Sequence, residues 1–271
     1  MKKPFKLIQV FDDPAAGYRG NISAVILLDK LPPADILQRI ASDFAQPATT
    51  FLAPAGQQNH FLVRWFAPDG EIDLCGHGSS AAMAFLNQEW PDEEYTLRYT
   101  GGELTGKIEN GDISLISLAE IPVLKELPVD QALKEGLGVP IIGYWHTKNK
   151  DIVLVNSEID LANMKPDFNR LRDRKTFGYA VTAKAENVDF ASRTLVPHVS
   201  QLEDQATGSS HAILAPFWAK RMGKNQLTAV QLSPRKGRFS CIYKPVEGQV
   251  QLKGHFSIIA SGQLNLESGN Y

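Results

Sequence analysis

The spacing of hydrophobic and polar residues predicts a mixture of strands and helices. Hydrophobic and polar residues alternate over 5–11, and an apolar run follows at 24–28, so both segments are predicted as strands. At 33–44 the apolar positions recur every three or four residues, which is typical of a helix that packs one face on a core. A further strand is predicted at 61–66, and the run 81–86 is apolar on nearly every side, as in a buried helix.

The middle of the chain carries signals for antiparallel strand pairing. Strand-like segments at 95–99, 104–109 and 113–118 are separated by turns, and Asn110-Gly111 is a strong hairpin signal. The pattern restarts near residue 120, which is the natural domain boundary. Beyond it we expect a helix near 129–136 and strands near 141–147, 152–156, 178–183 and 188–195.

The two halves of the sequence resemble each other. The segment Arg64-Trp65-Phe66-Ala67-Pro68 has a counterpart in Arg193-Thr194-Leu195-Val196-Pro197, 129 positions later. The segment Gly78-Ser79-Ser80 has a counterpart in Gly208-Ser209-Ser210, 130 positions later. Either small residues agree by chance or the chain is duplicated. Duplication predicts a first lobe at 1–119, to which a last strand at 258–271 can be added, and a second lobe at 120–257.

The composition is that of an ordinary globular protein without a strong charge. Of 271 residues, 43% are hydrophobic and 21% are charged, which excludes a disordered or fibrous chain. The 28 basic and 30 acidic residues nearly cancel, so no general field attracts nucleic acid or an anionic membrane. No apolar stretch approaches the roughly 20 residues of a transmembrane helix, and no apolar leader follows the first lysines. With only two cysteines, we expect a cytoplasmic protein without a disulfide framework.

Each half places glycine and serine at the start of a predicted helix. The unpaired N–H groups and the helix dipole at such a position favour a bound anion, and two such turns suit a carboxylate. A simple helix cap, with Ser79 or Ser209 accepting backbone hydrogen bonds, is the alternative for each turn. If the chain is duplicated, the cleft between the lobes is the expected site.

Two titratable side chains lie beside these turns. His77 stands between two glycines of the first turn, where it can exchange a proton with a bound molecule or serve a structural role. Asp204 precedes the second turn, where it can stabilise the helix dipole or act as the proton-transfer partner of His77.

The cysteines test a further mechanism, in which two facing thiols act on opposite sides of one carbon. Cys75 precedes the first turn, but its mate at an offset of 129 or 130 is Asp204 or Gln205, and neither is a thiol. Cys241 lies in a strand-like segment and is expected to be buried in the core. A two-thiol mechanism is therefore disfavoured. The sequence also lacks a phosphate loop, a nucleotide-binding fingerprint and a paired-histidine metal motif.

In their order along the chain, these motifs resemble those of the PhzF-like family of phenazine-biosynthesis-type isomerases, which has the diaminopimelate epimerase fold. The likeness covers nearly the whole sequence. The resemblance implies an α+β fold of two pseudo-duplicated lobes, each an antiparallel β-barrel-like sheet wrapped around a central helix. The matching segments are 9–11, 19–21, 64–68, 73–78, 203–211, 233–237 and 262–264.

The resemblance also implies a function. It indicates an isomerase in a biosynthetic process that uses no metal or organic cofactor and moves a proton within a small carboxylated substrate bound between the lobes. His77 and Asp204 are then the expected catalytic residues. No nucleic-acid or membrane partner is expected, and the apolar run at 213–222 fits either the core or a homodimer interface. The expected substrate contacts are Gly76, Gly78, Ser79, Gly208 and Ser209.

One position departs from the family pattern. The family's catalytic glutamate belongs to a Ser-Glu-Thr-Ala-Phe-like segment, and the corresponding run here is Pro47-Ala48-Thr49-Thr50-Phe51, so Ala48 takes its place. A methyl group cannot transfer a proton, and loss of a general acid or base typically costs about 10²- to 10⁴-fold in rate. Two hypotheses follow. The protein is an isomerase that works through His77 and Asp204, or it is a catalytically silent protein that binds small carboxylates.

Overall fold

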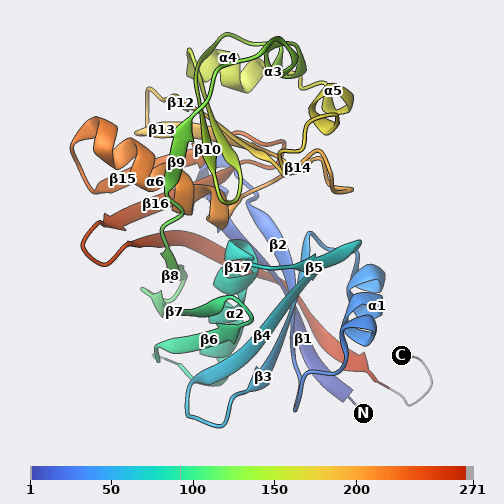
Figure 1. Cartoon of the computed structure of the whole chain (residues 1–271). Helices are drawn as coiled ribbons and strands as arrows, with labels where there is room; N and C mark the ends of the chain where they lie inside the picture. The colour runs from blue at the N-terminus through green and yellow to red at the C-terminus, as the bar shows by residue number, and fades with distance from the viewer. Residues whose placement is uncertain (1, 92, 267–271) are drawn as a thin grey trace. The chain divides into compact units, whose positions relative to one another are not determined.

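Strands predominate in the structure, as the alternation of hydrophobic and polar residues predicts. The computed structural model describes residues 2–91 and 93–266 (Figure 1). The chain divides into unit 1, made of Met1–Leu118 and Leu252–Tyr271, and unit 2, made of Ala119–Gln251. Each unit has its own set of paired strands and its own buried helix.

In the described residues, the strands of unit 1 close into a ring of eight. They pair in the order β1, β2, β3, β4, β6, β7, β8 and β17, and β17 pairs again with β1. The pairs β2–β3 and β4–β6 are parallel, because a helix connects the two strands of each pair. The strands are β1 (Lys2–Asp12), β2 (Asn21–Leu27), β3 (Ala48–Pro54), β4 (His60–Ala67), β5 (Gly70–Ile72), β6 (Tyr95–Tyr99), β7 (Gly102–Glu109), β8 (Ile113–Ala119) and β17 (Gln249–Asn265).

Helix α2 (Gly76–Glu89) is the central helix of unit 1. Every residue from 76 to 86 is buried, and the helix contacts β1, β2, β3, β6 and β7 (Figure 1). A helix that is surrounded by strands must be apolar on all sides, which explains why this segment shows no single hydrophobic face. The ring of strands therefore holds the first turn of α2 in a fixed place.

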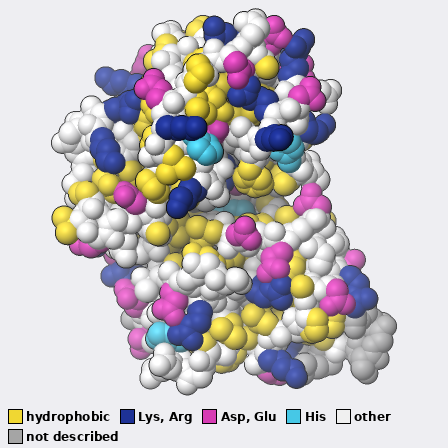
Figure 2. Space-filling view, in the orientation of Figure 1, with side chains coloured by type: hydrophobic (Ala, Val, Ile, Leu, Met, Phe, Trp, Pro, Cys, Tyr) yellow, Lys and Arg dark blue, Asp and Glu magenta, His cyan; other side chains and the backbone are white. Residues whose placement is uncertain are grey.

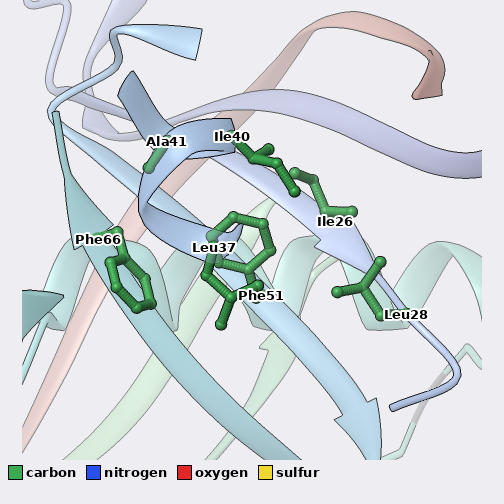
Figure 3. Close-up of a cluster of buried hydrophobic side chains, with 7 residues drawn as sticks. All are labelled: Ile26, Leu28, Leu37, Ile40, Ala41, Phe51 and Phe66. Atoms are coloured by element: carbon green, nitrogen blue, oxygen red, sulfur yellow. The ribbon is translucent and has the colours of Figure 1, made fainter. Parts of the chain in front are cut away.

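Helix α1 (Ala34–Phe44) packs on the outside of the same sheet, against β3 and β4. Its apolar face contacts two phenylalanines of the sheet, Phe51 and Phe66, whose rings meet edge to face with centroids 5.8 Å apart. This arrangement is the amphipathic helix that the spacing over 33–44 predicts. The buried cluster, shown in Figure 3, consists of Ile26, Leu28, Leu37, Ile40, Ala41, Phe51 and Phe66.

Unit 2 repeats the strand pairing of unit 1. Strands β11 and β12 are parallel like β2 and β3, and β13 and β15 are parallel like β4 and β6. The pairs β10–β11, β12–β13, β13–β14 and β15–β16 are antiparallel, like β1–β2, β3–β4, β4–β5 and β6–β7. The buried helix α6 (Gly208–Met222) has the same place in the chain order as α2 has in unit 1. Each of these helices follows the first strand of the second parallel pair and precedes the second strand. This repeated topology supports the duplication.

The remaining elements of unit 2 are short. Its strands are β9 (Val123–Glu126), β10 (Ile141–Thr147), β11 (Asp151–Val155), β12 (Tyr179–Lys184), β13 (Phe190–Leu195), β14 (Glu203–Asp204), β15 (Gln226–Gln231) and β16 (Gly237–Lys244). Its other helices are α3 (Gln131–Leu137), α4 (Glu158–Asn163) and α5 (Phe168–Arg172). Within the described residues, no helix is long and apolar enough to cross a membrane.

The surface carries both signs of charge. On the face shown in Figure 2, Lys and Arg side chains lie among Asp and Glu side chains, and hydrophobic side chains are scattered between them. Opposite charges that lie close together cancel at a distance, as the net charge of -2 suggests. Recognition of a ligand must therefore come from a local site.

Candidate functional site

The first turn of α2 is shaped by the residue that precedes it. Cys75 is the N-cap residue, and its Sγ accepts a hydrogen bond from the Gly78 N–H at 3.3 Å. The Ser79 hydroxyl donates to the Cys75 carbonyl oxygen at 2.7 Å. A Cβ atom at Gly78 would lie 2.6 Å from the Trp65 ring, so only glycine fits there. Cys75 thus takes the capping role that one of the two alternatives gave to Ser79, whose hydroxyl instead donates to the Cys75 carbonyl oxygen.

His77 lies inside this turn, and the side chain of Asn21 at the start of β2 reaches it. The Asn21 Nδ2 and His77 Nδ1 atoms are 3.3 Å apart, and both side chains are buried. The Cys75 Sγ atom lies 3.5 Å from His77 Nδ1 and 3.7 Å from its Nε2. Since β2 and α2 contact each other, the core of unit 1 holds this imidazole in place. Imidazole, thiol and amide are the groups that this turn offers for chemistry.

Ala48 is the first residue of β3 and is fully buried. Its carbonyl oxygen accepts a hydrogen bond from the Ser23 hydroxyl at 3.1 Å, and that hydroxyl also lies 2.7 Å from Thr50 Oγ1. Thr50 Oγ1 in turn would lie 2.7 Å from a Cβ at Gly78, in the first turn of α2. Two side chains, those of Ser23 and Thr50, therefore connect position 48 to the first turn of α2. The side chain at position 48 itself is only a methyl group.

The first turn of α6 in unit 2 is preceded by Thr207. Its backbone angles, φ -113° and ψ 104°, nearly equal those of Cys75, φ -117° and ψ 99°. The Thr207 hydroxyl makes no cap bond to the helix and instead lies 2.7 Å from Asp204 Oδ2. The buried Gln231 accepts from the Thr207 N–H at 2.8 Å and donates from Nε2 to Thr207 Oγ1 at 3.1 Å. Asp204 is thus tied to the helix start through a hydroxyl and an amide.

A buried lysine also reaches the first turn of α6. The residue Lys150, between β10 and β11, is only 5% exposed, and its Nζ donates to Ser209 Oγ at 2.9 Å and to Asn149 Oδ1 at 2.7 Å. The sequence interpretation missed Lys150, because Lys148-Asn149-Lys150 has the composition of a solvated turn. It also assigned no role to Asn21 or Gln231. Only a three-dimensional structure brings these residues to the helix starts.

The equivalence of the two turns corrects two expectations. Gly208 opens α6 as Gly76 opens α2, so the two Gly-Ser-Ser segments, matched at an offset of 130, are not in register. The sequence offset placed Asp204 or Gln205 opposite Cys75, whereas the matching N-cap residue is Thr207, at an offset of 132. The reason is a longer loop between β13 and β14 than between β4 and β5. Neither candidate nor Thr207 is a thiol, so the argument against a two-thiol mechanism holds for the corrected mate as well.

One arginine–glutamate ion pair in each unit supports the corrected offset of 132 positions. Arg64 on β4 makes two hydrogen bonds to Glu71 on β5, both 2.6 Å long. Arg193 on β13 makes two to Glu203 on β14, both 2.8 Å long. The arginines are 129 positions apart and the glutamates 132, so three residues have been added between them. Each pair fixes the strand that leads into the central helix of its unit.

The remaining cysteine and the nearby histidine are core residues. Cys241 on β16 is fully buried, which confirms the expectation for it, and burial raises the pKa of its thiol. His211 in α6 is also fully buried and stacks on Phe239 with ring centroids 3.6 Å apart. Desolvation lowers the pKa of His211 to about 4. Among the described residues, no group of three or more His, Cys, Asp and Glu side chains is arranged to hold a metal ion.

The expected site residues fall into two sets, one in each unit. Gly76, His77, Gly78 and Ser79 form the first turn of α2, together with the cap residue Cys75. In unit 2, Gly208 and Ser209 open α6, and Asp204 lies at the end of β14 just before it. Within unit 1 the imidazole is held by an amide, and within unit 2 the carboxylate is held by a hydroxyl and an amide.

Comparison with known proteins identifies relatives along most of the chain. A family model described as phenazine biosynthesis-like protein, PhzC-PhzF, matches residues 8–262. An uncharacterised isomerase of Pseudomonas aeruginosa is 36% identical over 252 residues, which cover 92% of this chain and 94% of that protein. Phenazine biosynthesis-like domain-containing protein 2 of Mus musculus is 31% identical over 293 residues, which cover 97% of this chain and 99% of that protein.

Solved structures show the same architecture. A PhzF-family phenazine biosynthesis protein from Enterococcus faecalis is 30% identical, with a TM-score of 0.88 over 98% of this chain and 100% of that one. A hydroxyproline epimerase from Agrobacterium vitis shares the fold at 10% identity, with a TM-score of 0.65 over 99% of this chain and 94% of that one. The prediction of an α+β fold, in which the sheet of each duplicated lobe wraps around a central helix, is therefore confirmed.

Proposed function

Because this chain belongs to the family of phenazine biosynthesis-like proteins, PhzC-PhzF, we propose that it is an isomerase that moves a proton within a small carboxylated substrate. The reaction needs no metal or organic cofactor. His77 and Asp204 carry the chemistry. The observation that carries the proposal is that both titratable groups stand at equivalent, hydrogen-bonded helix starts in a duplicated fold.

Charge at the start of α6 supports a carboxylate as the ligand. The Lys150 ammonium group lies beside Ser209, where the helix dipole is already positive. A bound anion would interact favourably with this buried ammonium group and with the positive helix end. The substrate carboxylate therefore binds near Lys150 and the N–H groups of Gly208 and Ser209.

Solvent-proton exchange tests the proposal. The full-length protein is incubated with small amino and aromatic carboxylates in D₂O, and mass spectrometry measures deuterium uptake. We expect uptake with the wild type, and a decrease of about 10²- to 10⁴-fold for His77→Ala and for Asp204→Asn. His198→Ala and Asp173→Asn, at exposed positions, are the matched controls and keep the wild-type rate. Equal rates in all five proteins would overturn the assignment of the two residues.

A second substitution tests the carboxylate site. Lys150→Met keeps the length of the side chain and removes its charge. We expect it to lower the kcat/KM of any exchanging carboxylate at least about tenfold, because the ammonium group stabilises both the bound carboxylate and the charge that develops on it when the proton leaves. An unchanged kcat/KM would exclude Lys150 from the binding site.

Ala48 supports one alternative function, a catalytically silent protein that binds small carboxylates. The buried methyl group at this position cannot take the place of the family's glutamate. This alternative predicts that a carboxylate raises the melting temperature of the wild type without any deuterium uptake. It also predicts that Ala48→Glu creates uptake. Uptake by the wild type would refute the alternative.

A further inference from the structure

A buried amide lies beside the titratable group of each unit, and a backbone N–H fixes its orientation. In unit 1, Asn21 Oδ1 accepts a hydrogen bond from the Ile22 N–H at 3.0 Å. A backbone N–H can only donate, so the oxygen of the amide must face Ile22. The Nδ2 group of Asn21 is then the atom that faces His77 Nδ1, at 3.3 Å.

This orientation fixes the tautomer of His77. An amide NH₂ group only donates, so His77 Nδ1 must accept, and the proton of the neutral imidazole is on Nε2. The Cys75 sulfur lies within hydrogen-bond distance of both ring nitrogens, at 3.5 Å and 3.7 Å, so it does not favour one tautomer over the other. The contact with Asn21 favours the tautomer with the proton on Nε2.

The turn before Asn21 explains why the sequence has Arg19-Gly20-Asn21. Gly20 has a positive φ of 52°, and a Cβ atom there would lie 2.0 Å from the carbonyl oxygen of Val10. Only glycine can make this turn, which places Asn21 at the start of β2 and within 3.3 Å of His77. The segment Arg19-Gly20-Asn21 thus positions the Asn21 amide beside the His77 imidazole.

In unit 2, the amide of Gln231 acts on Asp204 through a hydroxyl. Gln231 Oε1 accepts from the Thr207 N–H, so its Nε2 group is the donor to Thr207 Oγ1. The Thr207 hydroxyl has one proton, and with Gln231 donating to its oxygen it donates that proton to Asp204 Oδ2. Asp204 is thereby held as a hydrogen-bond acceptor, whereas His77 is held as a donor through Nε2.

We propose that Asn21 is a positioning residue that makes His77 a neutral hydrogen-bond donor, and that Asp204 alone moves the proton. This inference rests on the proposed function. The substrate required is a carboxylate with a C=C bond one carbon further along. Asp204 removes a proton from the carbon beside the carboxylate, so a C–H bond breaks, an O–H bond forms on Asp204, and the electron pair is delocalised over the carboxylate and the double bond. Asp204 then gives the proton to the far carbon of the former double bond, where the electron pair forms the new C–H bond. The double bond moves next to the carboxylate, and Asp204 is again ionised. Meanwhile His77 Nε2–H donates to a substrate oxygen and stabilises the charge that develops there.

The tautomer can be measured without a substrate. The full chain is labelled with ¹⁵N-histidine, and two-bond ¹H–¹⁵N correlation spectra at neutral pH report which ring nitrogen of each histidine is protonated. We expect His77 to be protonated on Nε2 in the wild type. In Asn21→Asp a carboxylate faces Nδ1 and accepts, so we expect the proton to appear on Nδ1. Asn187→Asp, at an exposed position of unit 2, is the control and keeps the Nε2 form.

Kinetics separate a donor from a base at position 77. Glutamine has an NH₂ group that donates but cannot take up a proton, so we expect His77→Gln to keep the exchange rate within about tenfold of the wild type, while His77→Ala loses about 10²-fold or more. Asp204→Asn is expected to lower the exchange rate by about 10²- to 10⁴-fold. Equal inactivity of His77→Gln and His77→Ala would show that His77 is a base and would refute this division of roles.

The two proposals fail in different ways. If the wild type shows Nδ1 protonation of His77, the positioning role of Asn21 is wrong even where exchange is observed. If the Nε2 form is found and no carboxylate in the panel exchanges, the positioning role of Asn21 holds, and both the proposed isomerase activity and the role of Asp204 are refuted.

Discussion

The buried histidine of α6 makes a quantitative prediction about acid stability. His211 is fully buried, its Nδ1 donates to the Thr207 carbonyl oxygen at 2.8 Å, and its Nε2 has no hydrogen-bond partner among the described residues. Its ring lies between Phe239 and Phe190, with centroids 3.6 Å and 5.8 Å away. Protonation would place a charge in this apolar site, and desolvation therefore lowers the pKa of His211 from 6.5 to about 4.

The sign and size of the effect follow from linkage. Between pH 6.5 and pH 4 the unfolded chain binds a proton at His211 that the folded chain excludes, so the free energy of unfolding falls as the pH falls. The full contribution is present above pH 6.5 and amounts to about 3 kcal/mol. From pH 7 to pH 4.5 the loss is about 2 kcal/mol.

Urea denaturation followed by tryptophan fluorescence measures this loss. The wild type is compared with His211→Phe, which keeps an aromatic ring among its neighbours and removes the titration. Because both proteins share all other titrating groups, the difference between their unfolding free energies isolates His211. We expect this difference to shift by about 2 kcal/mol in favour of the variant between pH 7 and pH 4.5. Parallel curves for the two proteins would refute the reasoning.

Two further predictions concern the ion pairs and a turn. Arg193 and Glu203 are 10% and 12% exposed, so Glu203→Gln is expected to lower the free energy of unfolding by about 2–3 kcal/mol in urea titrations. Glu71→Gln, in the equivalent but more exposed pair, is expected to cost less than about 1 kcal/mol, and equal losses would contradict the burial argument. Gly20→Ala is expected to abolish soluble expression, because its Cβ would lie 2.0 Å from a backbone oxygen. Gly17→Ala, which also has a positive φ but has nothing within 4 Å, is expected to leave soluble protein that is about 1 kcal/mol less stable.

Much of the fold could be predicted from local patterns. The helix over 33–44 and the hairpin at Asn110-Gly111 are both present, the latter with φ of 54° and 85° at its two turn residues. The helices α4 and α5 were not predicted, because each is shorter than two full turns and shows no periodicity. The parallel pairs within each sheet were also missed, since pairing across a helix leaves no local signal in the strands.

The candidate site was only partly visible in the sequence. His77 and Asp204 could be named because glycine and serine cluster beside them at the helix starts. The partners of these residues come from distant segments: Asn21 lies 56 positions from His77, and Lys150 lies 59 positions from Ser209. Contacts of this kind depend on strand order, which no local pattern encodes. The residue that matches Cys75 was predicted wrongly for a related reason. A match that rests on a few small residues does not reveal a three-residue insertion between the two matched segments.

The two units share a duplicated fold but differ at the residues that begin their central helices. The two central helices begin with the same backbone conformation, yet one cap is Cys75, which bonds its own helix, and the other is Thr207, which bonds Asp204 instead. The titratable groups beside the two caps also differ, because unit 1 has the imidazole of His77 and unit 2 has the carboxylate of Asp204. In the proposed reaction a single acceptor, Asp204, both removes and returns the proton, which would explain why Ala48 can stand where the family has a glutamate.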